Sequence, residues 1–526
     1  MEDSLIQLND LPDEIFMMIL KKLHSCDVLY SLIGVNKRLD TIVQDSFFTA
    51  YLTLTVPPYG FLNFTDPILD RFCSKILPKI HHKIGWINVE SSSMERFLRS
   101  TNYPNLYGLG LCNLASETAR DLFTDGSYLI QNFKNQISSL VVHISKRCQE
   151  STSIKDINIF IYRQIFTWFE NLKTLNFNPT SASHYDRLTF GPSPPRIFSS
   201  TLLELRVVVE TYEDCLYLLD GRFNRLNTFY VTICSSDGPV LPLINNEKKL
   251  PNLQCFTLIL KSVLLAYNNF LIPLLHRMLN LEELSLCFVN HNTPIIDGND
   301  LKMNIMNYMT KLKKFKFNIH SVIQINNQIN LPSNEHIQHT FKNFANKNQI
   351  ISSIDCFPKA NEFHCHIYSY PYIWTDYDNI TNSFRGGLFK SVLKLSLVDE
   401  RPFEHEFFLR IAKSFPCVEE LHVDNREPQK NDNQQWSIIE YSYLMQLDLL
   451  KTHENYVEQF LNNTKLSLLH NICFRVDYNT LQRVTDNFTS DTTRMNCSKI
   501  KYLFLCNQPE FCSPNLKDYF AHAEIC

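Results

Sequence analysis

The feature of this sequence that most limits its possible folds is one short apolar pattern that recurs along most of the chain. The pattern is apolar-x-x-apolar-x-apolar, and it occurs fifteen times at a mean spacing of about 30 residues. One such triplet means little in an apolar chain, but a long series at similar spacing indicates a repeating structural unit. The triplets begin at Ile84, Leu106, Ile137, Leu172, Leu202, Leu226, Leu253, Leu281, Leu312, Ala360, Val392, Val418, Leu444, Leu469 and Ile500.

The segments between the triplets carry a different periodicity. Residues 158–169, 213–219 and 407–415, among others, place apolar side chains at helical spacing. A strand followed by a helix at a fixed period predicts a solenoid, in which each unit buries its apolar residues by stacking on its neighbours. The longest gap, residues 312–360, is too long for one unit; its Asn- and Gln-rich middle, 318–348, holds either a degenerate unit or a projecting loop.

The repeat is similar to leucine-rich repeats of the long variety, which have a full helix in each unit. The Asn or Cys that the family carries three residues after the last apolar position is missing nearly everywhere, and Thr180, Glu210, Lys261 and Val289 stand there instead. We therefore expect an α/β fold in which an irregular solenoid of about fifteen units covers residues 84–507. Its parallel strands line a concave face, its helices lie outside, and residues 508–526 form a C-terminal cap or tail.

In such a solenoid, the residue between the last two apolar positions of each triplet points outward into the curve. The outward column is mixed in charge and size, which suits one specific protein ligand better than a repetitive one. The predicted target-binding residues are Arg206, Tyr230, Lys316, His364, His422 and Phe504.

The first fifty residues have a separate pattern. Ile15 to Leu20 is an unbroken apolar run that follows Pro12, a residue suited to the first turn of a helix. A helix that is apolar nearly all round must be covered on two sides, and about forty residues cannot build a core that does so. The pattern predicts that a second protein covers one side. Asp27 and Asn36 are expected to cap two further helices, the last of them extending to Phe47.

This stretch resembles the F-box, by which substrate receptors attach to the adaptor subunit of cullin-RING ubiquitin ligases. The matching residues are Leu11-Pro12-x-Glu14-Ile15, Ile19-Leu20-x-x-Leu23, Asp27-x-Leu29 and Val35-x-Lys37-Arg38, whereas Asn36 and Leu39 depart from the usual Cys and aromatic residue. The resemblance implies a three-helix F-box module over residues 1–50, followed by a packing segment over 51–83. The adaptor-binding residues that it implies are Leu11, Pro12, Ile15, Ile19, Leu20, Leu23, Val35, Lys37 and Arg38.

Composition limits the other classes of function. The net charge of −4 gives no electrostatic case for nucleic-acid binding. The 16 cysteines are scattered without a C-x-x-C pair, and His364-Cys365-His366 supplies only half of a zinc site, so we expect neither a metal nor a cofactor. Polar residues interrupt the most apolar segment, 263–279, so no membrane span is predicted, and without a secretory signal the chain is expected in the cytoplasm, the nucleus or both.

The sequence also contains no catalytic motif, which predicts a protein that is not an enzyme. The function that fits best is the substrate-recognition subunit of an SCF-type ubiquitin ligase. In that function the F-box binds the adaptor, and through it a cullin, while the repeats bind an unknown target protein. The alternative is a non-catalytic repeat scaffold whose N-terminal helices only cap the solenoid.

Overall fold

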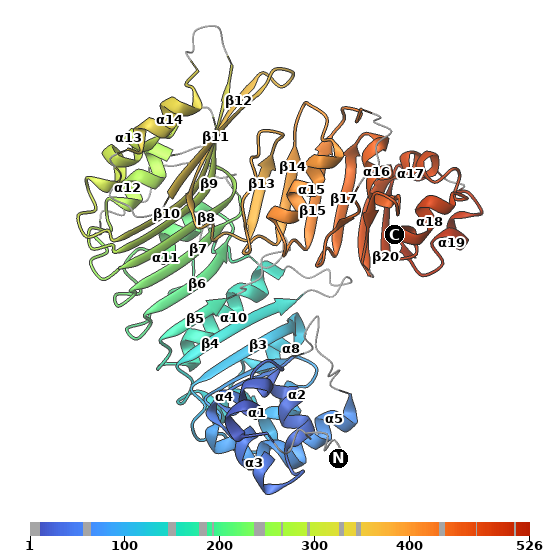
Figure 1. The fold of residues 1–526 in the computed structure, drawn as a ribbon. Coiled ribbons are helices and arrows are strands. Elements are labelled where there is room, and N and C mark those ends of the chain that lie inside the picture. Colours follow the sequence, from blue (N-terminus) through green and yellow to red (C-terminus); the bar gives the residue numbers. More distant parts are fainter. Residues whose placement is uncertain are drawn as a thin grey trace. The chain divides into compact units, whose positions relative to one another are not determined.

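The computed structural model shows a mixed α/β protein with a large parallel sheet (Figure 1). It divides into two compact units, the first comprising Met1–Phe288 and Met303–Phe315 and the second Val289–Lys302 and Lys316–Cys526. The residues that the structure describes are 11–55, 65–145, 154–177, 187–191, 194–235, 248–264, 267–291, 295–325, 331–342, 344, 349–430, 437–469, 471–509 and 512–526.

The first unit begins with short helices. They are α1 (Asp13–Leu20), α2 (Ser25–Leu32), α3 (Lys37–Val43) and α4 (Ser46–Thr49). Asn36 caps α3 as predicted, its side-chain oxygen accepting from the amide of Leu39 at 2.8 Å. Pro12 is the N-cap of α1 and not its first helical residue, and His24, not Asp27, precedes α2. Asn9 and Asp10 also precede the helix in the sequence and are of the residue types that accept from first-turn amides, but both lie outside the described residues.

The predicted third helix is broken in two. Gln44 closes α3, and the Asp45 side chain accepts from the amide of Phe47 to begin α4. The break rotates the chain, so that Phe48 is fully buried while Phe47, the predicted core residue, is half exposed. The apolar spacing alone did not show this break, because the capping residue that causes it lies between two apolar positions.

The following segment packs directly against these helices. It contains β1 (Tyr51–Leu54), α5 (Asp66–Arg71), η2 (Phe72–Ile76), α6 (Leu77–Ile80) and η3 (His81–Lys83). Arg71 donates to the backbone carbonyls of Tyr30 and Ile33 on the α2 side, at 2.9 and 3.3 Å. The Cys26 thiol donates to the carbonyl of Thr53 in β1 at 3.0 Å. These contacts join the helical module to the first strand of the array.

The strands of the first unit lie side by side in sequence order, parallel wherever the pairing is described. They are β1, β2 (Trp86–Glu90), β3 (Gly108–Ala115), β4 (Ser139–Ser145), β5 (Thr174–Phe177), β6 (Glu204–Val209), β7 (Thr228–Ile233), β8 (Cys255–Leu264) and β9 (Glu283–His291). The middle residues of successive triplets pair in register, for example Leu175 with Leu205 and Phe229 with Phe256. The repeated pattern therefore corresponds to a repeated strand.

Helices occupy most of the connections between these strands, as the spacing predicts. They are α7 (Met94–Arg99), α8 (Ser116–Leu122), α9 (Tyr128–Phe133), α10 (Ile154–Trp168), α11 (Tyr212–Leu218), η4 (Tyr267–Leu271) and α12 (Ile272–Leu275); α13 (Gly298–Leu301) and η5 (Lys302–Met306) follow β9. Together with the triplet side chains they form the core: Phe97, Ile130, Ile161 and Leu275, one from each of four helices, are all buried.

Polar side chains link consecutive units at the residue just before a triplet, and not at the position three residues after it. The residue just before a triplet donates its side chain to a backbone carbonyl of the preceding unit. The donor–acceptor pairs are Asn105 with His82, Gln136 with Tyr103, Asn171 with Asn135, Thr201 with Glu170, Asn252 with Asn224 and Asn280 with Pro251. This polar ladder at the strand entrance satisfies carbonyls between units where the usual Asn or Cys after the triplet is missing.

The second unit does not continue the parallel pattern. Its first strands are β10 (Lys314–Gln324), β11 (Gln349–Phe357) and β12 (Glu362–Tyr370), with α14 (Asn334–Thr340) between the first two. β12 pairs antiparallel with β10 on one side and with β11 on the other. The prediction that all triplet strands are parallel is therefore wrong for β12. A tight connection of Pro358 to Asn361 joins β11 to β12 as a hairpin, which forces antiparallel pairing.

A second sheet of seven strands completes this unit. Its order is β13 (Asp376–Ile380), β14 (Lys394–Val398), β15 (Glu420–Asn425), β17 (Gln446–Thr452), β19 (Ile472–Asp477), β20 (Ile500–Cys506) and β21 (Glu524–Ile525), and β16 (Ile439–Glu440) pairs separately with β18 (Leu466–Ser467). The helices are α15 (His405–Ser414), α16 (Glu454–Leu461), α17 (Tyr478–Val484), α18 (Asp491–Cys497) and α19 (Leu516–Tyr519). All described pairs in this sheet are parallel, and Leu516, Tyr519 and Phe520 pack as a buried C-terminal cap.

Candidate docking surfaces

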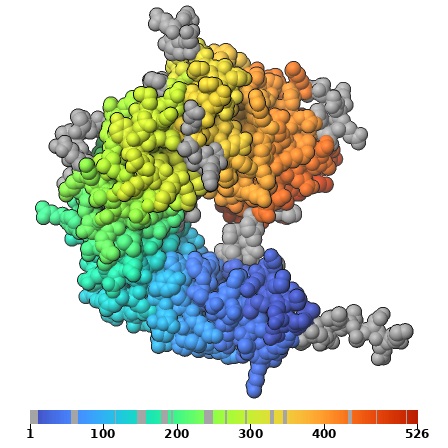
Figure 2. Space-filling model, turned by 60° about the vertical axis from the view of Figure 1, so that its left-hand side comes forward, coloured from blue at the N-terminus to red at the C-terminus, as the bar shows by residue number. Residues whose placement is uncertain are grey.

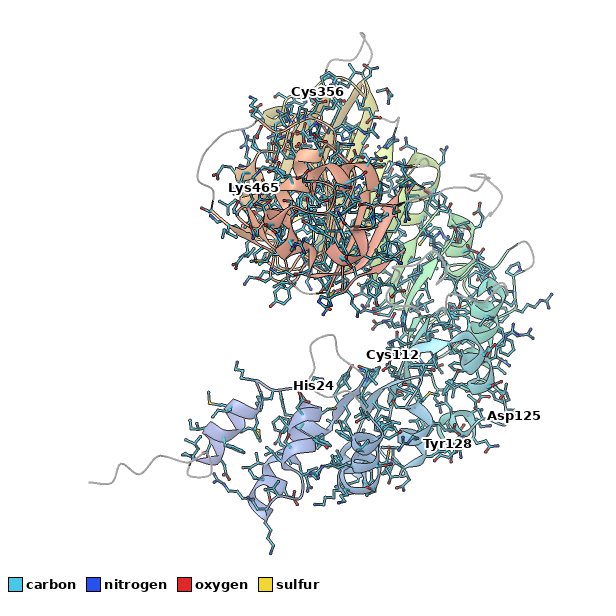
Figure 3. All side chains as sticks on the ribbon, turned by 90° about the vertical axis from the view of Figure 1, so that its right-hand side faces the viewer. His24, Cys112, Asp125, Tyr128, Cys356 and Lys465 are labelled. Atoms are coloured by element: carbon cyan, nitrogen blue, oxygen red, sulfur yellow. The ribbon has the colours of Figure 1, made fainter. Side chains whose placement is uncertain are left out.

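One face of helix α1 is apolar and exposed. The exposed fractions are 45% for Ile15, 65% for Met18 and 42% for Ile19, positions that share one side of the helix. Leu23 and Val35, at 53% and 59%, lie on the loops that flank α2, whose start His24 marks in Figure 3. The opposite side of α1 packs inward through Phe16 and Leu20. The helix is thus apolar on two sides, and the described part of the chain covers one of them.

Leu20 is a correction to the predicted adaptor-binding set. It is only 4% exposed, because it lies on the inward side of α1 together with Phe16, so it stabilises the module and is not available to a partner. Pro12 is exposed, and Leu11 is half exposed at the start of the same helix. The surface of the module forms the blue end of the chain in Figure 2.

Arg38 and Lys37 lie at the start of α3, both exposed. The Arg38 guanidinium is 2.7 Å from the Asp13 carboxylate and also donates to the carbonyl of Leu11. Arg38 therefore fixes the first turn of α1 relative to α3. This makes it a positioning residue for the exposed face, which the sequence pattern alone did not distinguish from a contact residue.

The strand face of the first unit brings two of the predicted target-binding residues together. Arg206 and Tyr230 are partners in the β6–β7 register, and the Arg206 guanidinium carbon lies 3.9 Å from the centroid of the Tyr230 ring. Glu204 accepts from Arg206 at 2.6 Å. Burial, followed by the hydrogen bond with Cys255, raises the pKa of Tyr230 to about 12, so its hydroxyl stays protonated. The pair forms a stacked, partly exposed patch of the kind that is enriched at protein interfaces.

A second group of strand-face residues lies on the seven-stranded sheet. Ser396, His422, Asp448, Arg475 and Phe504 are successive partners in register. Asp448 lies 3.5 Å from the His422 ring and 3.6 Å from Arg475. Burial alone raises the pKa of Asp448, but His422, the Leu450 amide and Arg475 outweigh it and lower the pKa. The predicted residues His422 and Phe504 thus belong to one charged and aromatic row beside a small cavity of about 150 Å³.

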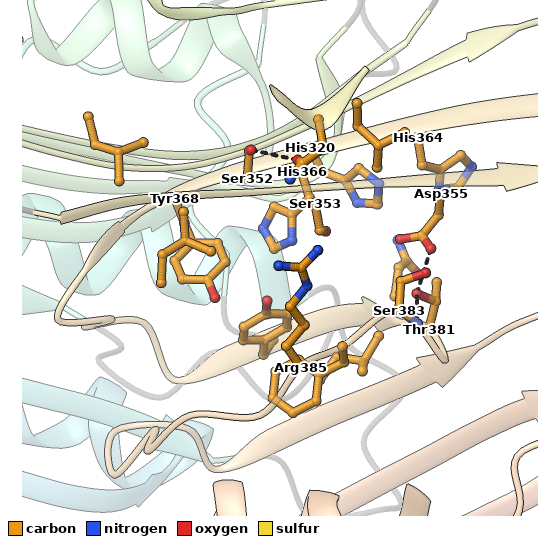
Figure 4. A pocket seen from close by; sticks show the side chains of 18 of the residues that line it. His320, Ser352, Ser353, Asp355, His364, His366, Tyr368, Thr381, Ser383 and Arg385 are labelled. Carbon is orange, nitrogen blue, oxygen red and sulfur yellow. Dashed lines mark hydrogen bonds between the residues drawn. The ribbon is translucent and has the colours of Figure 1, made fainter. Parts of the chain in front are cut away.

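The remaining predicted residues, Lys316 and His364, lie in the second unit near a larger cavity. This cavity has a volume of about 520 Å³, and its floor is the face of β10, β12 and β11 that carries His320, His364 and His366 (Figure 4). The ring centroid of His320 is 4.9 Å from that of His364 and 5.3 Å from that of His366. Lys316 is on the same face of β10 as His320 and is half-buried.

The histidines of this cavity are held neutral. Burial lowers the pKa of His366 to about 4. Burial, then the neighbouring His366, His364 and His291, lowers the pKa of His320 well below its usual value. His366 Nε2 contacts the Asn318 side-chain oxygen at 2.6 Å, and His364 Nε2 contacts Glu362 at 3.0 Å. At neutral pH the floor of the cavity therefore offers uncharged donors and acceptors.

The other wall of the cavity follows the end of β13. Tyr377 packs its ring 5.3 Å from that of His366, and Thr381 donates to the Asp355 carboxylate at 2.8 Å. Arg385 is exposed and points toward Ser353 and His366 in Figure 4. Within the described residues Arg385 has no hydrogen bond or ion pair, so its charge is available at the cavity.

Sequence reasoning placed only His364 among these cavity residues. His364 and His366 lie on one face of β12 and the buried Cys365 on the other, as alternation along a strand requires. Sequence reasoning missed His320, Asp355, Tyr377 and Arg385. His320 lies in residues 318–348, which were interpreted as a degenerate unit or a loop; this stretch contains the end of β10 and α14, while residues 326–330, 343 and 345–348 lie outside the described part. Asp355 follows in β11, whose β-branched residues Ile350, Ile351 and Ile354 were the available signal.

The described residues contain no candidate metal site, and three buried thiols are held protonated. None of its described His, Cys, Asp and Glu side chains form a group of three or more that could hold a metal ion. Burial raises the pKa of Cys26, Cys215 and Cys365 to about 12, which keeps these thiols protonated and unreactive. Among the described helices, none is both long and apolar enough to cross a membrane.

Comparisons with known proteins add little. No family model matches the chain, and no curated protein matches it. Among solved structures, the chain is similar to the crystal structure of the Rad7 and Elc1 complex in yeast, with 9% sequence identity over 98% of this chain and 92% of that chain. The TM-score of that match is 0.23, which is too low for the likeness to support any conclusion about fold or function.

Proposed function

We propose that this protein is a substrate receptor of a cullin-RING ubiquitin ligase. The observation that carries the proposal is the exposed apolar face of α1, formed by Ile15, Met18 and Ile19, on a module whose sequence resembles the F-box. A face of this kind on a small helical module indicates a protein-docking site. Leu23, Val35 and the exposed positions Pro12 and Lys37 surround it.

The proposed mechanism is proximity. The adaptor binds the module, a target protein binds the strand faces, and the assembly raises the effective concentration of the ubiquitin-charged enzyme at the target. The contacts of Arg71 and Cys26 fix the module to the first strand of the array, which favours a defined distance between the two partners. In this proposal the chain has no chemistry of its own.

The same contacts favour a second function, a non-catalytic scaffold in which the helices only cap the array. Arg71, Cys26 and Lys79, whose amine lies 3.1 Å from Asp40, would all serve a cap equally well. The two functions differ in what they require of the outer face of α1. A cap gains nothing from exposed Met18 and Ile19, whereas a docking helix needs them.

Co-purification with the ligase adaptor tests the proposal. Met18→Glu places a charge at a residue that is 65% exposed, so it should leave the fold intact and reduce adaptor recovery about tenfold or more. Met303→Glu is the matched control, because Met303 is also 65% exposed but lies outside the module. Equal adaptor recovery by both variants, or no recovery by the wild-type protein, would overturn the proposal in favour of the cap.

A further inference from the structure

Strand β11 has an open edge. It is the last strand of its sheet and spans the nine residues Gln349–Phe357, and β12 is its only neighbour among the described strands. Beyond its ladder with β12, the only contact to its backbone from the residues that the structure covers is a long one of 3.5 Å, from the Gln338 side chain to the carbonyl of Ile350. Half of the backbone donors and acceptors of an edge strand face away from its neighbour, and these remain available.

This edge lacks the features with which proteins usually block strand addition. Exposed edge strands are commonly protected by Lys, by Pro, by a bulge or by very short length. Gln349–Phe357 contains neither Lys, Arg nor Pro, its register with β12 runs without a shift, and its one charged side chain, Asp355, is engaged by a hydrogen bond from Thr381. A long, regular edge without such protection is either an aggregation hazard or a place where another chain binds.

The large cavity runs along this edge. Seven consecutive residues of β11, from Gln349 to Asp355, line it. Side chains alternate between the two faces of a strand, so a cavity lined by seven consecutive residues must run along the backbone at the open edge of β11. On one face Ser352 binds Asn334 and Gln338 of the α14 side, at 2.7 and 2.8 Å. The space beside the strand is therefore bordered by ordered polar groups on both sides.

The charges around the edge indicate what the added strand carries. Asp355 already accepts a hydrogen bond from Thr381, whereas Arg385 makes no hydrogen bond or ion pair among the described residues and points toward Ser353 (Figure 4); Glu335 of α14 is the carboxylate that feels its charge. The histidines next to it are uncharged. An acidic side chain on the added strand, at the level of Ser353, would meet this cation in a partly enclosed site, where charge-assisted hydrogen bonds are strongest.

We propose that β11 binds an extended acidic segment of a partner protein, which adds to its open edge as a β-strand and places a carboxylate against Arg385. The recognition combines main-chain hydrogen bonds along Gln349–Asp355 with one charge contact. The site belongs to the second unit. It stands whether or not the N-terminal module binds an adaptor, and if the receptor function is correct it is the place where a target is held.

A random nonapeptide library displayed on phage, panned against the full-length protein, tests this proposal. We expect enrichment of peptides with β-branched residues and at least one Asp or Glu, without central Pro, because Pro removes a ladder donor. When an enriched peptide is added, hydrogen exchange should slow in the amides of Gln349–Phe357. No enrichment, or slowed exchange elsewhere but not in β11, would overturn the proposal.

Two variants and a matched control sharpen the test. Ser353→Lys places a lysine on the cavity face of β11, and Arg385→Glu reverses the charge at the cavity. Each should lower the affinity for the enriched peptide about tenfold or more. Lys390→Glu, a change of the same sign at an exposed lysine outside the cavity lining, should change the affinity less than about twofold. Because Arg385 is exposed, its variant remains informative even if Ser353→Lys fails to fold.

A second copy of this chain or a small anion at the edge of β11 would give different results in these experiments. If the edge pairs with a second copy of this chain, sedimentation shows a dimer that Ser353→Lys dissociates, and the enriched peptides compete with dimer formation. If the cavity holds only small anions, Arg385→Glu weakens binding while central Pro in the peptide does not. Either result contradicts the proposal. Adaptor co-purification by Ser353→Lys and Arg385→Glu should equal that of the wild-type protein, which separates this inference from the receptor function.

Discussion

The parallel array of the first unit and the interrupted array of the second use the same apolar triplet but differ in their polar residues. In the first unit, side chains such as Asn252 and Asn280 at the strand entrances bond to the preceding unit. In the second, the polar groups gather in a cavity beside the antiparallel hairpin, where His320, His364 and His366 meet. Polar residues thus support the repeat where it is regular and form a candidate binding site where it is broken.

The apolar cores of the two units should be equally important. Phe229, the middle residue of its triplet, and Phe474, the last residue of its triplet, are both fully buried, and each pairs in register with apolar residues on both neighbours. Replacing either with Ala should lower the free energy of unfolding by about 3–5 kcal/mol, because a large cavity remains. Urea denaturation measures the loss. A much smaller effect in one unit would show that its triplets do not form a continuous core.

Lowering the pH should reduce the stability of the second unit more than that of the first. The pKa of His366 is about 4 in the folded protein against 6.5 for a free histidine, so between these values the unfolded chain binds the extra proton. The stabilising contribution is complete above pH 6.5 and is lost as the pH falls toward 4. From pH 7 to pH 5 the loss is about 2 kcal/mol for this residue.

The variant His366→Gln isolates that effect. Gln keeps a donor for Asn318 but does not titrate, so its stability should fall less steeply with acid, as measured by denaturation at pH 7 and pH 5. His82→Gln, at an exposed histidine of the first unit, should keep the wild-type slope. Identical slopes for the wild-type protein and His366→Gln would contradict a neutral, buried His366.

The polar ladder should have a smaller effect, confined to the first unit. Asn252→Ala and Asn280→Ala each remove a hydrogen bond of 2.7 or 2.8 Å between units and should cost about 1 kcal/mol each. Asn102→Ala, at an exposed position that makes no such bond, serves as the control. Hydrogen exchange should show faster opening at β8 and β9 in the ladder variants. If Asn102→Ala costs as much as they do, the ladder has no structural role.

The smallest expected effect concerns the charges on the strand face of the second unit. Lys394 and Glu420 are cross-strand partners 2.7 Å apart, and both side chains are partly exposed, at 40% and 36%. Solvent screens such a pair, so Lys394→Ala should change the free energy of unfolding by less than about 1 kcal/mol, and less still in high salt. A large, salt-sensitive loss in thermal denaturation would show that this row of charges holds the sheet together.

What the sequence could predict follows from repetition. The triplets identified fifteen strands, because a pattern seen many times needs no single strong signal. Two of them differ from the expected parallel, in-register stacking. The antiparallel β12 carries the triplet at Ala360, and its direction depends on the short hairpin before it, which the pattern does not record. In the Leu469 triplet the last residue, Phe474, pairs with the middle residues Leu447 and Leu503 of its neighbours. The hydrogen bonds of the ladder, such as that of Asn280 to the preceding unit, required the structure.

The candidate sites divide in the same way. The exposed face of α1 follows from a helix that is apolar all round, so Ile15 and Ile19 were predicted and only Leu20 was assigned to the wrong side. The cavity beside β11 was not predicted, since it depends on residues as far apart in the chain as His320 and Arg385. Local periodicity finds surfaces made by one element, whereas a site assembled from several elements requires their packing.

Calorimetric titration of the purified full-length protein with the purified ligase adaptor is the most direct test of whether the α1 face binds the adaptor. We expect saturable binding at one site per chain, with a negative heat-capacity change from burial of the α1 face. Binding should be lost in Ile19→Asp and kept in Met303→Glu. If the wild-type protein gives no binding, or if Ile19→Asp folds and binds the adaptor as tightly as the wild-type protein, the exposed helix has another purpose and the receptor function is wrong.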